Sequence, residues 1–164
     1  MSSQPFFSKE TYIARRQVLK QQVGQGVILL PGNNESSANY KDNWYPFRQD
    51  STFLYYAGII QAGLALVIDA ATGQEILFGD ELSIDDIVWT GPLPSLAELA
   101  AAAGIQKVLP AKEITNYLKG DVLYLPSYRG EQTIAISSWL NKPVQQVQSG
   151  ASVTLIKAIA KQRS

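Results

Sequence analysis

Four carboxylates in the middle of this chain are the residues whose type and spacing best suit chemistry: Asp80, Glu81, Asp85 and Asp86. Carboxylate oxygens are the ligands that Mg²⁺ and Ca²⁺ prefer, so the group could hold a hard cation and support metal-assisted hydrolysis. However, the spacing matches no calcium-loop pattern. Acidic side chains near a helix start are also stabilised by the helix dipole while they face solvent. We favour this second interpretation, and a carboxylate-only metal hydrolase is the alternative.

The chain contains no histidine and no cysteine, which excludes most other catalytic arrangements. Ser-His-Asp and Cys-His arrangements, imidazole acid-base catalysis, Cys-ligated zinc and a disulfide framework are ruled out. A Ser-Lys pair is possible in principle, but no serine lies in a Gly-x-Ser-x-Gly context. Gly24 and Gly26 come between a predicted helix and a predicted strand, which is the wrong order for a phosphate-binding loop.

Residues 44–56 hold the densest aromatic group of the chain, with a charged pair inside it. Such a group could line a ligand pocket or an interface, although it more often forms core. Its members are Trp44, Tyr45, Phe47, Phe53, Tyr55 and Tyr56. Arg48 and Asp50 are charges within an apolar stretch, where charged side chains are usually hydrogen-bonded in a fixed geometry. We predict that they form a structural pair or network that holds the loop before residue 51.

Length and composition predict one globular domain, or one domain with a tail. The 164 residues allow a sizeable core, and 46% hydrophobic and 17% charged residues are typical of such a protein. Because Lys and Arg balance Asp and Glu at 14 each, there is no positive field to collect nucleic acid. The first residues lack the features of a signal peptide, and no apolar run reaches the roughly 20 residues of a membrane span. We therefore expect a cytoplasmic protein with neither nucleic acid nor a membrane as partner.

Hydrophobic spacing, caps and turn residues predict an alternation of helices and strands. The first half is predicted to contain a helix over 9–23 with Ser8 as N-cap, a strand over 27–30, a polar loop over 33–43, a short helix over 53–56 capped by Ser51 and ended by Gly58, and a hairpin of strands 64–69 and 75–78. A short helix over 83–89 and a capping-box helix from Ser95 to Gly104 follow. The remaining predicted elements are a strand over 107–109, a helix over 111–118, a strand over 121–125, a helix near 131–140, a strand near 144–147 and a last helix from about 152. This order predicts an α/β domain with a mixed, mostly parallel β-sheet flanked by helices on both faces.

One signature in the chain resembles that of a known family. It consists of Tyr45, Pro46, Phe47, Arg48, Gln49 and Asp50, followed by Phe-Leu-Tyr-Tyr-Ala-Gly at 53–58. This run is similar to the amino-terminal domain of Xaa-Pro aminopeptidases (aminopeptidase P), in the creatinase/prolidase group. Arg15 and Arg16 in the first helix and the Trp-x-Gly segment at 89–91 add to the similarity. The family commonly has a basic residue soon after this Trp-x-Gly segment, whereas this chain has Pro92 there.

The resemblance implies a fold like the creatinase/prolidase N-terminal domain, with a ribonuclease H-like motif. Full-length members remove the N-terminal residue that precedes proline, using two divalent ions, typically manganese. The metal ligands (two Asp, one His and two Glu) lie in a C-terminal catalytic domain. The resemblance therefore implies that residues 1–151 are a non-catalytic N-terminal domain without a cofactor. Residues 152–164 would begin the connecting helix to an absent catalytic domain.

Partners also follow from the resemblance. It implies contact with the protein's own catalytic domain, assembly into dimers or tetramers, and a role in active-site access. Trp89 would then line the substrate pocket of a neighbouring subunit, whereas packing of Trp89 against its own hairpin is the alternative. For the whole chain, the alternative is a stand-alone ligand- or protein-binding module of the same fold, which would use the 33–44 loop and the aromatic group as its binding surface.

Overall fold

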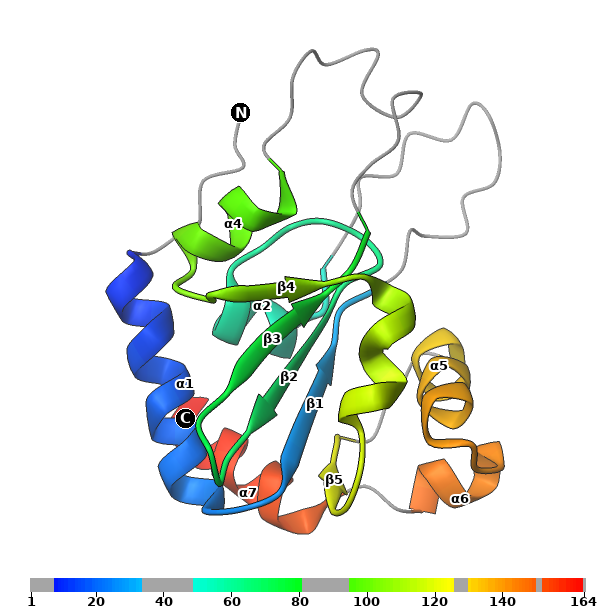
Figure 1. Cartoon of the computed structure of the whole chain (residues 1–164). Coiled ribbons are helices and arrows are strands. Elements are labelled where there is room, and N and C mark those ends of the chain that lie inside the picture. Colours follow the sequence, from blue (N-terminus) through cyan, green and yellow to red (C-terminus); the bar gives the residue numbers. More distant parts are fainter. Residues whose placement is uncertain (1–7, 34–48, 81–94, 126–129, 150–151, 164) are drawn as a thin grey trace.

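The computed structural model describes residues 8–33, 49–80, 95–125, 130–149 and 152–163 (Figure 1). The elements are, in chain order, α1 (Lys9–Val23), β1 (Val27–Pro31), α2 (Ser51–Ala57), β2 (Ala65–Asp69), β3 (Glu75–Phe78), α4 (Leu96–Ala102), β4 (Lys107–Leu109), the 3-10 helix η1 (Ala111–Tyr117), β5 (Val122–Leu123), α5 (Gly130–Leu140), α6 (Val144–Ser149) and α7 (Val153–Arg163). The helix predicted over 83–89 lies outside these residues, and so does the predicted 33–43 loop after Asn33.

The strands form one mixed sheet in the order β4-β3-β2-β1-β5. β1, β2 and β3 are antiparallel neighbours, and the predicted hairpin is present, with Leu66 opposite Leu77. β5 lies parallel to β1, and β4 lies parallel to β3. The predicted mixed α/β sheet is confirmed. The expectation of a mostly parallel sheet needs correction, because the described pairs are divided equally between the two directions.

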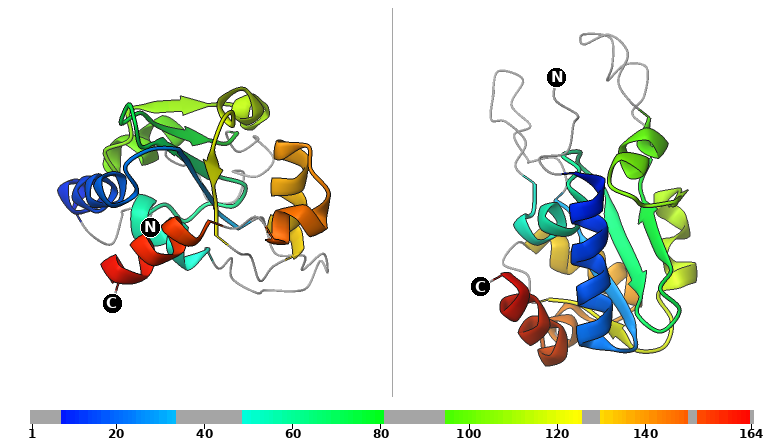
Figure 2. Two further views of the ribbon diagram at one scale, coloured as in Figure 1. Left: turned by 90° about the horizontal axis from the view of Figure 1, so that it is seen from below. Right: turned by 90° about the vertical axis from the view of Figure 1, so that its left-hand side faces the viewer.

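Helices cover both faces of the sheet, as predicted (Figure 2). Side chains alternate between the faces along a strand. Leu66 and Ile68 of β2 point into a core that α1, α2, α4 and α7 complete. Val67 points the other way, into a second core shared with η1, α5 and α6. Burial of β1 and β2 on both sides explains why their sequences are continuous apolar runs.

Helix caps follow the predicted residues with one exception. Ser8 caps α1, and Ser95 and Glu98 form the predicted capping box of α4. For α2 the prediction of Ser51 as N-cap is wrong: Ser51 is the first helical residue, and Asp50 is the cap. The Asp50 Oδ2 atom accepts a hydrogen bond from the backbone N–H of Phe53 at 2.9 Å. A carboxylate suits this position because it also faces the positive end of the helix dipole.

Two predictions in the second half are corrected. Residues 144–147 are not a strand but belong to α6, where the N–H of Val147 donates to the carbonyl of Pro143 at 3.1 Å. Proline favours the start of a helix, and the three-residue spacing of Val144 and Val147 fits helical rather than strand periodicity. The predicted helix over 111–118 is a 3-10 helix that ends at Tyr117.

The last helix, α7, packs against the domain rather than extending away from it. Leu155 is fully buried, Ala158 and Ile159 are almost so, and all three belong to the core that contains α1 and α2. Figure 2 shows α7 beside α1 on the same side of the sheet. None of the helices in the described part of the chain has the length and apolar run that a membrane crossing requires.

Candidate functional site

Gln49 belongs to the signature at 45–50, and its side chain lies in the interior of the domain. Its side chain is buried and makes four hydrogen bonds. Oε1 accepts from the backbone N–H groups of Asn33 (2.9 Å) and Asp50 (3.0 Å). Nε2 donates to the carbonyls of Ile59 and Gln61, both at 2.9 Å. Since an amide side chain has two donors and two acceptor positions, Gln49 is fully engaged in joining the exit of β1 to both ends of α2.

The neighbouring backbone is shaped to fit Gln49. A Cβ atom on Gly32 would lie 2.9 Å from Gln49 Oε1 and 3.0 Å from the Leu64 carbonyl, so only glycine lets these groups approach. The Gly32 N–H donates to that same Leu64 carbonyl at 2.8 Å. This end of the signature therefore positions backbone, and it presents no side-chain atom of Gln49 to a ligand.

Most of the other predicted site residues lie outside the described residues. These are Tyr45, Pro46, Phe47, Arg48 and Trp89. The pairing of Arg48 with Asp50 accordingly stays a prediction, and so does the position of Trp89. Within the aromatic group, Phe53 and Tyr56 are fully buried and form core, whereas Tyr55 is half-buried.

Of the four carboxylates in the acidic group, only Asp80 is described. It is exposed, and its Oδ1 accepts from the N–H of Ala111 at 3.3 Å. Glu81, Asp85 and Asp86 lie outside the described ranges. In the part of the chain that the structure covers, no three His, Cys, Asp or Glu side chains come together as a metal site would require.

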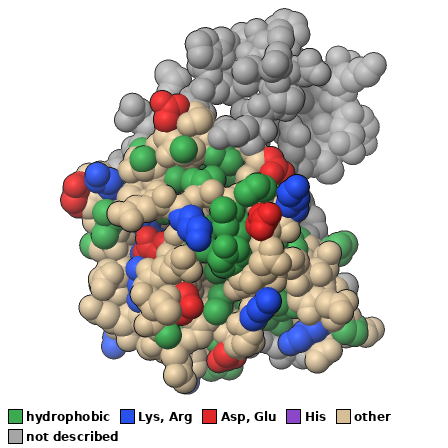
Figure 3. Space-filling model, in the orientation of Figure 1, with side chains coloured by type: hydrophobic (Ala, Val, Ile, Leu, Met, Phe, Trp, Pro, Cys, Tyr) green, Lys and Arg blue, Asp and Glu red, His purple; other side chains and the backbone are tan. Residues whose placement is uncertain are grey.

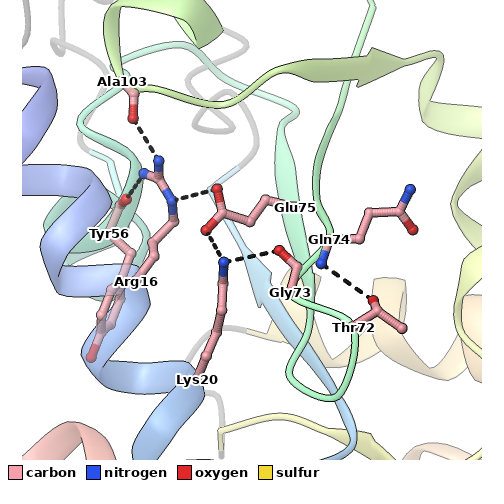
Figure 4. A network of polar contacts seen from close by, with 8 residues as sticks. All are labelled: Arg16, Lys20, Tyr56, Thr72, Gly73, Gln74, Glu75 and Ala103. Carbon is pink, nitrogen blue, oxygen red and sulfur yellow. Dashed lines mark hydrogen bonds and ion pairs between the residues drawn. The ribbon is translucent and has the colours of Figure 1, made fainter.

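A polar network that the sequence reasoning missed lies between α1 and β3 (Figure 4). Arg16 is completely buried at its centre. Nη1 donates to the Tyr56 carbonyl at 2.7 Å, and Nη2 donates to the Ala103 carbonyl at 2.6 Å. Nε lies 3.1 Å from Glu75 Oε1, an ion-pair distance without the angle of a hydrogen bond. Arg16 thus joins α1, the end of α2 and the end of α4.

Lys20, one helical turn after Arg16, completes the network. Its Nζ lies 2.7 Å from Glu75 Oε2 and donates to the Gly73 carbonyl at 2.9 Å. The two cations therefore share one carboxylate, and the turn between β2 and β3 is held against α1 (Figure 4). The sequence carried a signal for this arrangement, because Arg16 recurs with Tyr12 and Leu19 on the apolar side of a predicted helix.

Burial lowers the pKa of Arg16, while the Glu75 carboxylate acts in the opposite direction. A guanidinium loses its proton only far above neutral pH, so Arg16 stays charged and cannot act as a base. A buried charge of this kind is tolerated where hydrogen bonds and a counter-charge surround it. The network is accordingly structural.

A surface hollow of about 580 Å³ lies beside this network. It is lined by Ile13, Gln17, Lys20, Gly73, Gln74, Glu75, Gly104, Gln106 and Lys107. Lys20 and Glu75 form an ion pair there, and the lining residues that the structure describes include no serine, tyrosine or histidine. On the face seen in Figure 3, hydrophobic side chains gather centrally, with charged side chains of both signs around them. That view therefore shows no surface of a single charge sign.

The fold and these contacts define a class: a small α/β domain whose buried polar side chains hold helices to a mixed sheet. Residues 12–124 match the family described as aminopeptidase P, N-terminal domain. Because the match covers more than half of the chain, the chain belongs to this family. The resemblance inferred from residues 45–58 is thereby confirmed.

Curated relatives carry the same assignment in their names. A probable Xaa-Pro aminopeptidase of Metarhizium acridum is 28% identical over 137 residues, which are 82% of this chain and 26% of the relative. One of Arthroderma benhamiae is 28% identical over 99 residues, which are 60% of this chain and 19% of the relative. The chain thus spans about a fifth to a quarter of the length of these proteins.

Solved structures show the same fold. Aminopeptidase PepP of Pseudomonas aeruginosa superposes with a TM-score of 0.69 at 21% identity, covering 92% of this chain and 36% of that one. Escherichia coli aminopeptidase P in its low-pH form gives a TM-score of 0.70 at 22% identity, and the superposition covers 82% of this chain and 33% of that one. The E. coli enzyme is also known in a zinc-substituted form in complex with product, which covers 87% of this chain and 34% of that one at a TM-score of 0.69 and 22% identity. The expected N-terminal domain fold is confirmed.

Proposed function

We propose that this chain is the non-catalytic N-terminal domain of a metal-dependent Xaa-Pro aminopeptidase. The parent protein would remove an N-terminal residue that precedes proline, and it would do so in the cytoplasm. One observation carries the proposal: the chain matches the family over residues 12–124 yet contains no histidine. The structures it resembles are about three times longer, so the reaction would depend on sequence outside this domain.

The residues of this chain do not fit a two-metal centre. Such a centre needs several carboxylate or imidazole ligands converging on one point. Histidine is absent from the chain, and the described carboxylates form no such group. We therefore assign the two divalent ions, manganese by resemblance, to the catalytic domain, and we assign no cofactor to this chain.

For residues 1–151 we propose two supporting roles, oligomer assembly and control of active-site access. The second role follows from the resemblance of residues 89–91 to the family's Trp-x-Gly segment, with Trp89 lining the substrate pocket of a neighbouring subunit in a dimer or tetramer. Residues 152–164 would lead into the catalytic domain. The packing of α7 on α1 and α2 supports a firm rather than a loose connection.

The reading frame that contains this chain provides the first test. We expect it to continue past the codon for Ser164 and to encode Asp, His and Glu residues in the spacing of a two-metal peptidase. A stop codon directly after Ser164 would instead favour a stand-alone binding module. A second experiment tests the access role: in the longer protein, Trp89→Ala should raise KM for an Xaa-Pro peptide more than it lowers kcat. Unchanged KM and kcat would show that Trp89 does not line the substrate pocket.

A further inference from the structure

The last turn of α7 is fixed to the domain by a chain of hydrogen bonds. The Tyr56 hydroxyl, on a fully buried side chain, donates to Gln162 Oε1 at 2.7 Å. Gln162 Nε2 in turn donates to the carbonyl of Arg15 at 2.9 Å. Both polar atoms of the Gln162 amide are therefore used, and they hold the last turn of α7 to α2 and α1.

Arg163 then lies on the ring of Tyr55. Its guanidinium carbon is 5.2 Å from the ring centroid, and its Nη1 lies 3.3 Å from Thr52 Oγ1. The guanidinium carbon of Arg15 is 4.0 Å from the same centroid, and Arg15 Nη1 donates to the Tyr55 carbonyl at 2.9 Å. The Tyr55 ring is itself braced edge-on by Tyr56, with centroids 4.9 Å apart. We call Arg15, Thr52, Tyr55 and Arg163 the Tyr55 patch.

The Tyr55 patch concentrates positive charge in a chain whose formal net charge is zero. Two guanidiniums on one ring repel each other, and the face of the ring offsets only part of that repulsion. Arg163 is exposed, and within the described ranges it forms no ion pair with a carboxylate. A guanidinium held in place at the surface presents a planar fork of donors that matches a carboxylate. The patch is therefore complementary to an acidic side chain.

The position of the patch indicates where that acidic side chain would come from. Arg163 is the last residue of α7, and the curated relatives extend well beyond the part this chain matches, which is 19% of one and 26% of another. In a longer protein of this family, the polypeptide that follows would begin beside the patch.

We propose that the Tyr55 patch is the surface on which the catalytic domain of the same polypeptide docks, with an Asp or Glu side chain of that domain bound to Arg163. This inference rests on the proposed function, because it needs a catalytic domain in the same protein. It assigns α2 and the end of α7 as the interface. The signature next to α2 would then serve to place this surface.

Hydrogen-deuterium exchange tests the proposal on chain 1–164 and on the longer protein that contains it. Amides of residues 51–57 should exchange about fivefold or more slowly in the longer protein, because docking suppresses local opening of α2. Arg163→Glu should return that exchange to within about twofold of the rate in the isolated chain. Lys157→Glu is the matched control, since it makes the same charge change at an exposed position of α7 outside the patch.

The outcomes separate the patch from the proposed function. If residues 51–57 gain no protection, or if Arg163→Glu leaves the protection unchanged, the docking assignment is wrong. The docking assignment would then be wrong even if the longer protein hydrolyses Xaa-Pro peptides, so the proposed function could still hold. If the longer protein has no such activity, the proposed function fails independently of the exchange result. Melting of the Arg163→Glu chain 1–164 at the temperature of the unsubstituted chain, within a few degrees, shows that the substitution acts on docking and not on the fold.

Discussion

Tyr56 and Gln162 are 106 residues apart in the sequence, yet the hydroxyl of one donates to the side-chain oxygen of the other at 2.7 Å. This bond joins α2, which follows the family signature, to α7, the last element described. Together with the burial of Leu155, it makes α7 part of the folded domain although the family match ends at residue 124.

Replacement of Tyr56 by phenylalanine should therefore destabilise the chain. Tyr56→Phe keeps the ring but leaves the Gln162 oxygen without its donor, and a loss of about 1 kcal/mol in the free energy of unfolding is expected. Tyr55→Phe is the control, because it keeps the ring beneath both guanidiniums, and it should change stability by less than about 0.5 kcal/mol. Urea unfolding of the three chains measures the difference. Equal effects of the two substitutions would argue against a special role for the bond.

Alkaline pH should weaken the fold, in part through the same residue. Burial raises the pKa of Tyr56, and Tyr55 adds to this, whereas Arg163 and Arg15 act in the opposite direction. Burial also raises the pKa of Tyr124. The folded state therefore keeps these protons at a pH where the unfolded chain, with an ordinary pKa of about 10, loses them.

The sign of the effect follows from this difference. The contribution of each tyrosine to stability is complete below about pH 10 and decreases as the pH rises above it, by at most about 1.4 kcal/mol per pH unit. Urea unfolding between about pH 8 and pH 11.5 should show this decrease, and it should be shallower in Tyr56→Phe. Parallel curves for the two chains would contradict the account.

Loss of the buried guanidinium should be the most damaging change in the network of Figure 4. Arg16→Met leaves the Tyr56 and Ala103 carbonyls without their donors and removes a partner of Glu75, and it should cost about 3–5 kcal/mol. Lys20→Met is the control at the edge of the network, where the Lys20 side chain is 13% exposed, and it should cost about 1 kcal/mol. If chemical denaturation ranks the two variants the other way, Arg16 is not the centre of the network.

Replacement of Gln49 by glutamate should destabilise the fold. Gln49→Glu replaces two donors with a carboxylate that faces the carbonyls of Ile59 and Gln61, and a loss of about 3 kcal/mol is expected. For a domain of this size the melting temperature should fall by about 6–12 °C. Gln21→Glu, on the exposed side of α1, makes the same chemical change and should leave the melting temperature within about 2 °C. A comparable fall for both would show that charge, rather than lost donors, is responsible.

Local patterns predicted much of this fold. The helix over 9–23, the hairpin of β2 and β3 and the capping box at Ser95 all depend on neighbours in sequence, and the structure has them. The errors arose where local signals were weak or ambiguous. The short Val-Gln-Gln-Val run at 144–147 is predicted as a strand, whereas the hydrogen bond from the N–H of Val147 to the carbonyl of Pro143 identifies it as part of α6. The choice between Ser51 and Asp50 as cap depends on a single residue of helix register.

The site was harder to predict than the fold because its contacts join distant segments. The sequence predicted that Arg48 and Asp50 hold the loop before residue 51; Asp50 caps α2, whereas Arg48 lies outside the described residues and its role stays a prediction. The sequence offered no means of pairing Arg16 with Glu75, or Gln162 with Tyr56, since both pairs join segments that are far apart in the sequence. Such pairs depend on topology, which residue spacing alone does not specify.

We propose that this chain is part of an Xaa-Pro aminopeptidase and does not itself break the peptide bond. The most direct measurement is the release of the N-terminal residue from an Xaa-Pro peptide in the presence of Mn²⁺, by chain 1–164 and by the longer protein that contains it. We predict release by the longer protein and none by the chain above a no-enzyme control. Release by chain 1–164 that persists through repurification would contradict the account.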